Sequence, residues 1–237
     1  YLEKNLNKNL QQYFDLFYGT STGSIIASMI CLGYKVDMIK KKYINMLPSI
    51  MSPLRKKIRS AELRKYLEKE FENKDFYSFP KPIGIVATNL TKNRQIIFKT
   101  NVSQALGSQS TFKPGFGCSI AEAIEASCAA YPLYFHLKNI TNEQINAELV
   151  DGGYVANNPT LFAIIEARKA FKKELNQIYV LNIGTGTFIE KRGIVGKLIK
   201  RFNWISYMSN IFQANSQAFD DILAYLFDDV NKLRIND

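Results

Sequence analysis

The chain has 237 residues, of which 46% are hydrophobic and 22% charged, and its formal net charge is +10. This length suits one sizeable domain, and the hydrophobic fraction is enough for a packed core, which excludes a disordered chain. No run of residues is long and apolar enough to cross a bilayer, and no secretory signal opens the chain. Three cysteines without metal-ligand spacing fit a reducing compartment, so we expect a cytoplasmic protein.

The N-terminal part of the chain predicts a helix, a strand and a second helix. Residues 2–12 are typical of a polar helix, and the apolar-rich residues 13–17 predict a short buried strand. Residues 24–32 are apolar on nearly every side, which predicts a buried helix that Gly33 ends. The first residue is Tyr1 rather than Met, so we expect that a natural upstream segment is missing.

Between this strand and this helix lies the motif Gly-x-Ser-x-Gly, with Ser21 at its centre. The order strand, motif, helix predicts a nucleophile elbow, in which the serine hydroxyl projects from a turn too tight for a Cβ. The helix that follows points its N-terminal N–H groups at charge that develops there. We therefore predict Ser21 as the nucleophile and Gly19, Thr22 and Gly23 as elbow and oxyanion residues. The alternative is a structural Gly/Ser turn.

A basic stretch follows between residues 35 and 65. Its cations at 40–42 and 55–57 are interleaved with large apolar residues, which are Ile44, Met46, Leu47, Ile50, Met51 and Leu54. This mixture suits the surface of an anionic membrane, and the alternative is a solvated helix face on a basic protein. A nucleic-acid polymer is not expected as a partner, because no binding motif accompanies the charge.

The remaining elements alternate between helices and strands. Helices are predicted over residues 37–46, 60–72, from 120, 161–174 and 195–233, and strands over 82–89, 95–99, 147–150 and 177–183. Residues 119–122 (Ser-Ile-Ala-Glu) form a capping box at a helix start. This alternation predicts an α/β fold with a mostly parallel sheet and helices on both faces. We expect one domain over residues 1–237, with 195–237 as its helical C-terminal extension.

A serine nucleophile needs a partner that takes its proton. His136 is the only histidine and none follows Asp151, so the α/β-hydrolase order serine, acid, histidine is impossible with Asp151 as the acid. Asp151 ends a predicted strand, as Ser21 does, and such ends open on one edge of a parallel sheet. We predict Asp151 as the base, supported by a tight turn at Gly152 and Gly153. This dyad needs a dry site that raises the carboxylate pKa, and the alternative is an ordinary Asp-Gly turn.

Four segments, in this order, resemble the patatin-like phospholipase family: residues 19–23, 123–135, 151–159 (Asp-Gly-Gly, then Asn-Asn-Pro) and 180–186. The resemblance implies a three-layer α/β/α fold and hydrolysis of lipid acyl esters. It also implies a catalytic dyad, with Ser21 as nucleophile, Asp151 as base, and no metal or other cofactor. The expected partners are a lipid substrate and the phospholipid membrane surface, where the enzyme would be peripheral.

The chain departs from the family pattern in two places. The family forms its oxyanion hole from a glycine-rich loop before the serine, but no glycine precedes Gly19 here. The backbone N–H of Thr22 is then the one obvious donor, and losing a donor lowers the rate by roughly 10²–10³-fold. Either the chain starts downstream of that loop, which we favour, or the enzyme is impaired. The second departure is Tyr131 before Pro132, which alters the pocket wall more than the chemistry.

Three hypotheses follow from these residues. The leading one is a lipid acyl hydrolase of phospholipase A type that forms an acyl-enzyme on Ser21. Candidates for lining its acyl site, or simply the core, are Ile25, Ile26, Met29 and Leu133. The second hypothesis is a catalytically impaired lipid-binding or regulatory module on the same fold. The third is an esterase that uses His136 as its base.

The resemblance also leaves regulation open. Some bacterial patatin-like enzymes are effectors that a nucleotide second messenger activates in anti-phage defence. The helical tail from residue 195 would suit such control, by a nucleotide or by a protein activator. A homo-oligomer is a further expectation.

Overall fold

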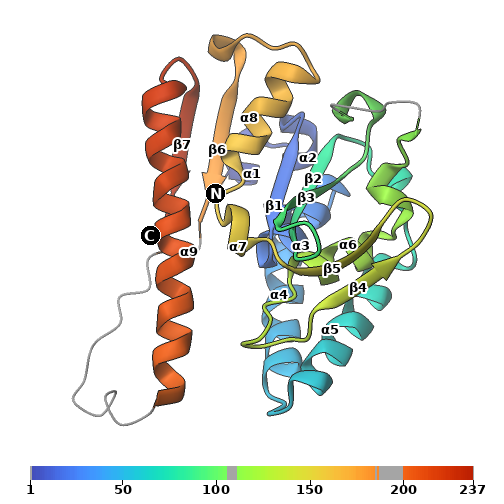
Figure 1. Ribbon diagram of the computed structural model, residues 1–237. Coiled ribbons are helices and arrows are strands. Elements are labelled where there is room, and N and C mark those ends of the chain that lie inside the picture. The colour runs from blue at the N-terminus through green and yellow to red at the C-terminus, as the bar shows by residue number, and fades with distance from the viewer. Residues whose placement is uncertain (1, 106–110, 185, 187–199, 237) are drawn as a thin grey trace.

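The computed structural model in Figure 1 describes residues 2–105, 111–184, 186 and 200–236. Its strands form a five-stranded sheet and a separate two-stranded sheet. The larger sheet consists of β1 (Phe17–Thr20), β2 (Ile83–Asn89), β3 (Arg94–Lys99), β4 (Lys138–Thr141) and β5 (Asn146–Asp151). The smaller sheet pairs β6 (Tyr179–Ile183) in parallel with β7 (Asn231–Ile235).

Strand β2 is the centre of the larger sheet, and all of its residues are buried. Strand β3 pairs antiparallel with residues 84–89, which occupies one edge of β2. The other edge is shared, because β1 pairs with residues 83–86 and β5 pairs with residues 87–89. Since β1 runs parallel to β2 and β5 runs antiparallel to it, the C-terminal ends of β1 and β5 meet end to end on this edge.

The prediction of a mostly parallel sheet is therefore wrong. Among the described strands of the larger sheet, β1–β2 is the parallel pair, and the β2–β3, β2–β5 and β4–β5 pairs are antiparallel. Strands β2 and β3, and likewise β4 and β5, follow one another through short turns, which join antiparallel strands only. The sequence did not predict β4, whose four residues include three polar ones.

The described helices are α1 (Leu2–Leu6), α2 (Leu10–Tyr13), α3 (Thr22–Cys31), α4 (Val36–Met51), α5 (Lys56–Phe71), α6 (Ile120–Ser127), α7 (Gly153–Ala156), α8 (Thr160–Lys169) and α9 (Lys200–Leu226). Helix α6 begins at the predicted capping box, in which Ser119 and Glu122 bond to each other's backbone N–H groups. Alternate residues of β1 face different helices, as a pleated strand requires. Phe17 packs into the main core with α3, whereas Tyr18 bonds to α8 and Thr20 to α7. Helices therefore cover both faces of the larger sheet, as predicted.

Several predicted boundaries are wrong in the N-terminal half. The helix expected over residues 2–12 is divided into α1 and α2, with Asn7 at a positive φ of 48° in the break. The strand expected over residues 13–17 starts only at residue 17, because α2 occupies the residues up to 13. Helix α4 continues past Pro48, which lies in its last turn and so removes a single intrahelical bond.

The C-terminal prediction is correct for α9 and wrong beyond it. The predicted helix start near residue 195 lies outside the described residues. After α9 the chain forms β7, which was expected to be helical. Helix α9 is the crossover that a parallel connection between β6 and β7 requires. Figure 1 shows α9 alongside β7 and β6, on the side of α8 away from the larger sheet.

The buried hydrophobic residues form two clusters. The main cluster lies between the larger sheet and α3, α4, α5 and α6. The second, smaller cluster joins α8, α9, β6 and β7 through Ile164, Ile178, Leu223 and Val230. Within the described part of the chain, no helix is both long and apolar enough to cross a membrane.

Candidate active site

Ser21 lies at the turn between β1 and α3, as the elbow prediction required. Its backbone has φ 52° and ψ −129°, a conformation that side-chain-bearing residues rarely adopt. A Cβ on Gly19 would lie 2.5 Å from the Cα of Ser24, so the close approach of strand and helix requires a glycine at this position. A Cβ on Gly23 would meet no atom within 4 Å, so packing does not explain the second glycine of the motif.

The structure brings Ser21 and Asp151 together. The Ser21 hydroxyl donates a hydrogen bond to Asp151 Oδ2 at 2.5 Å, although 130 residues separate the two. The register of β2 explains this contact, because Thr20 lies opposite Val86 and Asp151 lies opposite the next residue, Ala87. The end-to-end arrangement of β1 and β5 thus places the nucleophile and the acid side by side.

Asp151 is buried, with 3% of its surface exposed. Burial is the main reason why its pKa is raised to about 6, and the hydrogen bonds from Ser21 and from the Gly153 N–H oppose this rise. Among the described residues, no Lys or Arg forms a salt bridge with it. A carboxylate with a raised pKa, bonded to a serine hydroxyl, is arranged as a general base.

The two glycines after the acid have separate roles. A Cβ on Gly152 would lie 2.3 Å from the carbonyl oxygen of Val86, so this position allows the chain to turn against β2. A Cβ on Gly153 would lie 3.1 Å from Asp151 Oδ1, and the Gly153 N–H donates to the same oxygen at 2.8 Å. Gly152 thus allows the turn that follows Asp151, and Gly153 contacts its carboxylate; their predicted role in catalysis stays a prediction.

Sequence reasoning missed two serines that hold the backbone of Ser21. The Ser21 N–H donates to Ser127 Oγ at 2.9 Å, and the Ser127 hydroxyl donates to the carbonyl of Val86 at 2.6 Å. On the other side, the Ser24 hydroxyl donates to the carbonyl of Ser21 at 2.6 Å. Both serines are fully buried, where an unpaired polar group is unfavourable, so each hydroxyl stabilises the unusual backbone conformation of the nucleophile. The sequence signal that could have identified these two serines is a Ser at the end of an apolar helix, where it is expected to be buried.

Helix α3 begins at Thr22, directly after the nucleophile. The first N–H groups of a helix have no acceptor within it, and they lie at the positive end of the helix dipole. Thr22 and Gly23 are the first two residues of α3, so their N–H groups belong to this end of the helix. Their oxyanion role stays a prediction.

The other candidate base lies elsewhere. The His136 side chain is exposed, and its backbone N–H donates to Ser60 in α5.

The three cysteines, Cys31, Cys118 and Cys128, are buried and unpaired, as expected for thiols used as small apolar residues. Burial raises the pKa of Cys31 to about 12 and that of Cys118 to about 11. In the part of the chain that the structure describes, no group of three or more His, Cys, Asp or Glu could hold a metal ion.

Ser21 and Asp151 open into a cavity of about 1680 Å³. One wall is apolar and comes from α3 and α4, through Ile25, Ile26, Met46, Leu47, Ile50 and Met51. Ile25 and Ile26 were predicted there, but Met29 and Leu133, predicted with them, do not line this cavity. The Met29 side chain packs in the main core instead.

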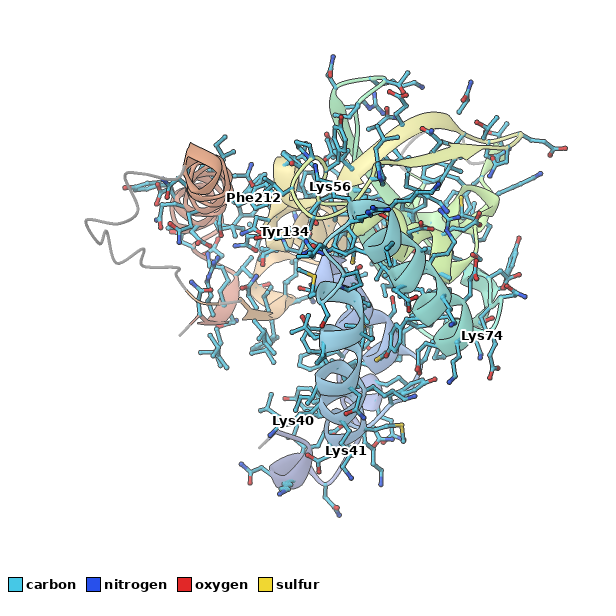
Figure 2. The ribbon with its side chains drawn as sticks, turned by 90° about the horizontal axis from the view of Figure 1, so that it is seen from below. Lys40, Lys41, Lys56, Lys74, Tyr134 and Phe212 are labelled. Atoms are coloured by element: carbon cyan, nitrogen blue, oxygen red, sulfur yellow. The ribbon has the colours of Figure 1, made fainter. Side chains whose placement is uncertain are left out.

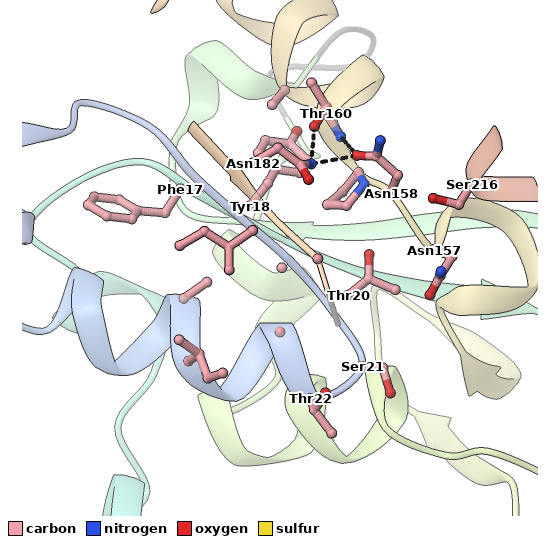
Figure 3. Close-up of a pocket in the computed structure, with 18 of the residues that line it drawn as sticks. Phe17, Tyr18, Thr20, Ser21, Thr22, Asn157, Asn158, Thr160, Asn182 and Ser216 are labelled. Atoms are coloured by element: carbon pink, nitrogen blue, oxygen red, sulfur yellow. Dashed lines mark hydrogen bonds between the residues drawn. The ribbon is translucent and has the colours of Figure 1, made fainter. Parts of the chain in front are cut away.

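A second part of the cavity wall, here called the polar wall, consists of Asn158, Thr160 and Asn182, which Figure 3 shows bonded to one another. Asn182 donates to Asn158 Oδ1 at 2.7 Å and to the Thr160 hydroxyl, and Asn158 donates to Asp220 Oδ1 at 2.8 Å. Asp220 in turn forms an ion pair with Arg234 of β7. The C-terminal strand and α9 thus hold the polar wall through hydrogen bonds rather than through a large apolar core.

Comparisons with known proteins show the family of the chain. The family model described as patatin-like phospholipase matches residues 1–164. A "cUMP-AMP-activated phospholipase" of Escherichia coli is 42% identical over all of this chain and 74% of its own length. A "cGAMP-activated phospholipase" of Escherichia coli (strain TW11681) is 25% identical over 82% of this chain and 56% of its own length.

Among solved structures, VipD from Legionella pneumophila covers 88% of this chain and 50% of its own, with a TM-score of 0.43 and 15% identity. The assignment rests on the family model, which spans the elbow and the acid, and on the relative aligned over the full chain. The chain belongs to the patatin-like phospholipase family.

Proposed function

We propose that this protein is a nucleotide-activated phospholipase that cleaves acyl esters of membrane glycerolipids with Ser21 and Asp151. The hydrogen bond of 2.5 Å between the Ser21 hydroxyl and the buried Asp151 carboxylate carries this proposal. Asp151 accepts the serine proton while Ser21 Oγ attacks the ester carbonyl. The tetrahedral intermediate expels the alcohol, which takes that proton, and leaves an acyl-enzyme. Asp151 then activates the water that releases the fatty acid.

The raised pKa of Asp151 supports its role as the base. An ordinary carboxylate, with a pKa near 4, takes a proton from a serine weakly. With a pKa of about 6 it is a stronger base and is still ionised at neutral pH. An acyl chain in the cavity would dry the site further and strengthen each electrostatic contact there. The oxyanion would bind the N–H groups of Thr22 and Gly23.

The cavity supports a lipid substrate. Its volume of about 1680 Å³ exceeds the roughly 300–1,000 Å³ typical of small-molecule pockets, which leaves room for a long acyl chain. The apolar wall from α3 and α4 would contact that chain, and the polar wall around Asn158 and Asn182 would contact the headgroup side.

The relatives support activation by a nucleotide. The name of the E. coli protein that is 42% identical over the whole chain states that cUMP-AMP activates it, and the more distant E. coli relative is named for cGAMP. We propose cUMP-AMP as the activator here, because the relative with the higher identity aligns with the whole chain, α9 and β7 included.

The test is covalent labelling by a lipid-like fluorophosphonate, read by intact mass, with and without cUMP-AMP. We expect one adduct on the parent chain, none on Ser21→Ala, and faster labelling with the nucleotide. Release of fatty acid from phospholipid vesicles should follow the same pattern. Absence of labelling in both states would contradict the enzyme proposal and favour the lipid-binding module. Labelling that cUMP-AMP leaves unchanged would contradict the nucleotide proposal alone.

A further inference from the structure

The turn between α4 and α5 exposes apolar side chains at the end of the molecule. Leu54 is 94% exposed in this turn, and Ile58, in the first turn of α5, is 45% exposed. Leu47, in the last part of α4, is 42% exposed. An isolated exposed leucine is ordinary, but three such residues close together on one tip mark a contact surface.

The cations around these residues are not neutralised. No Asp or Glu occurs between residues 38 and 61, whereas seven Lys or Arg do. Arg55, Lys56 and Lys57 form no salt bridge within the described residues, in contrast to Lys42, which pairs with Glu70. The tip therefore combines exposed apolar groups with free positive charge.

This tip adjoins the cavity that Ser21 lines, through Leu47. Leu47 is both exposed and part of the cavity lining, so the apolar wall reaches the surface beside the tip. Tyr134 lines the cavity from another segment, and the Arg59 guanidinium of α5 lies 6.0 Å from its ring centroid. The tip is therefore next to the cavity through Leu47, and α5 reaches the cavity wall through the contact of Arg59 with Tyr134.

We propose that the α4–α5 tip, composed of Leu47, Leu54, Arg55, Lys56, Lys57 and Ile58, docks on an anionic phospholipid bilayer and brings the adjoining cavity to it. This inference rests on the proposed phospholipase function and names the surface that delivers its substrate. Leu54 and Ile58 enter the headgroup region, while the three cations contact anionic headgroups. Each cation near such a surface contributes roughly 1 kcal/mol, which corresponds to about fivefold in the partition coefficient.

The same features argue against a nucleic acid as the occupant. A phosphate backbone would bind the cations but would leave Leu54 and Ile58 exposed, because neither can pair with a base edge. A bilayer satisfies both kinds of group at once, and its lipids are the substrate class of the adjoining cavity.

The test is co-sedimentation with vesicles, in a Ser21→Ala background so that the lipids stay intact. The vesicles are phosphatidylglycerol with phosphatidylethanolamine, and phosphatidylcholine alone serves for comparison. We expect binding to the anionic vesicles that weakens at high salt. Lys56→Glu with Lys57→Glu should lower the partition coefficient at low salt at least tenfold. Leu54→Gln should lower it severalfold at low and at high salt alike.

Matched controls make the same changes elsewhere. Lys40→Glu with Lys41→Glu reverses two exposed charges at the other end of α4 (Figure 2), and Leu90→Gln changes an exposed leucine in the turn between β2 and β3. Both controls should keep most of the binding. Equal losses in controls and tip variants, or no preference for anionic vesicles, would overturn the proposed surface. Because binding by the Ser21→Ala chain needs no chemistry, this result is independent of whether the protein proves to be an enzyme.

Discussion

Two of the buried carboxylates, Asp151 and Glu166, have opposite surroundings. Asp151 is 3% exposed and bonds to neutral donors, the Ser21 hydroxyl and the Gly153 N–H. Glu166 of α8 is 1% exposed, pairs with Lys99 of β3 and accepts hydrogen bonds from Tyr18 and Gln104. Burial together with Glu166 also raises the pKa of Tyr18, which therefore stays protonated and donates.

The comparison separates a carboxylate suited to act as a base from a structural clamp, by which we mean a carboxylate that ties neighbouring elements together. Burial removes water from both carboxylates, but of the two only Glu166 forms an ion pair with a cation, Lys99. Its charge is held in place and joins α8 to β1 and β3. The charge of Asp151 is opposed by burial without a cation, so this group takes up a proton more readily. Removing either charge, or the groups that surround it, tests this contrast.

Removing the charge of Asp151 should have the largest effect on catalysis. Asp151→Asn keeps the shape of the side chain but removes the base, and Ser21→Ala removes the nucleophile. Each should lower kcat/KM for phospholipid hydrolysis by about 10³–10⁴-fold. Steady-state release of fatty acid measures this, with the folded fraction checked by circular dichroism. A loss below tenfold in Asp151→Asn would show that another group serves as the base.

Removing the charge of Glu166 should have the largest effect on stability. Glu166→Gln removes the counter-charge of Lys99, whose side chain is 15% exposed, and this is expected to lower the free energy of unfolding by about 3 kcal/mol. Urea denaturation measures the change. The double variant Lys99→Met with Glu166→Gln should recover more than half of the loss, because no isolated charge is left. Additive losses in the double variant would contradict the ion-pair explanation.

Asp151→Asn should change stability in the opposite direction. The folded pKa of about 6 lies above the unfolded value near 4, so the folded chain binds the proton more tightly between these values. The carboxylate therefore lowers stability progressively as the pH rises from 4 through 6, by roughly 3 kcal/mol at pH 8. Denaturation curves should show that Asp151→Asn stabilises the chain by up to that amount at pH 8 and by little at pH 4.5. Stabilisation that is equal at both pH values would refute the linkage.

Ser127→Ala should impair the site although it replaces neither Ser21 nor Asp151. The Ser21 N–H would lose its acceptor, which is unfavourable by about 1–3 kcal/mol in a buried position, and the elbow would relax. We expect a 10–100-fold slower rate of fluorophosphonate labelling. Ser28→Ala is the matched control, because the Ser28 hydroxyl on α3 is buried and makes no hydrogen bond among the described residues. The labelling rate of this control should stay within twofold of the parent rate.

The smallest effect is the dependence of the rate on pH. Hydrolysis needs the ionised form of Asp151, so kcat/KM should be half-maximal near pH 6 and should fall about tenfold for each pH unit below it. Lys99→Met with Glu166→Gln should keep this midpoint, since Glu166 is a clamp. A midpoint near pH 4 in the parent chain would mean that burial does not raise the pKa of the base.

Local sequence patterns were sufficient for the features that a few neighbouring residues control. The elbow around Ser21, the capping box of α6, and strands β2 and β3 lie where the sequence predicted them. In each case the pattern states a short-range requirement, such as a glycine at a close approach or a hydroxyl at a helix start. The juxtaposition of Ser21 and Asp151 was also predicted, but the argument assumed a mostly parallel sheet, which is wrong.

The parallel-sheet argument placed both residues on one edge, whereas the structure places them where β1 and β5 meet on β2. Register between distant strands depends on which chain segments pair, and periodicity within one strand carries little of that information. Strand β7 was missed for the same reason, since its pairing with β6 is set across the length of α9.

The amino-acid sequence was enough to predict a nucleophile and its acid and to identify the family, because these depend on residue types at short spacings. Tertiary structure alone decided which serines hold the backbone of Ser21, which buried carboxylate pairs with Lys99, and that the basic α4–α5 tip adjoins the cavity through Leu47. These properties arise from contacts between segments far apart in the chain. Whether a carboxylate is a base or a clamp depends on the groups that packing brings to it, and its own neighbours in sequence do not specify them.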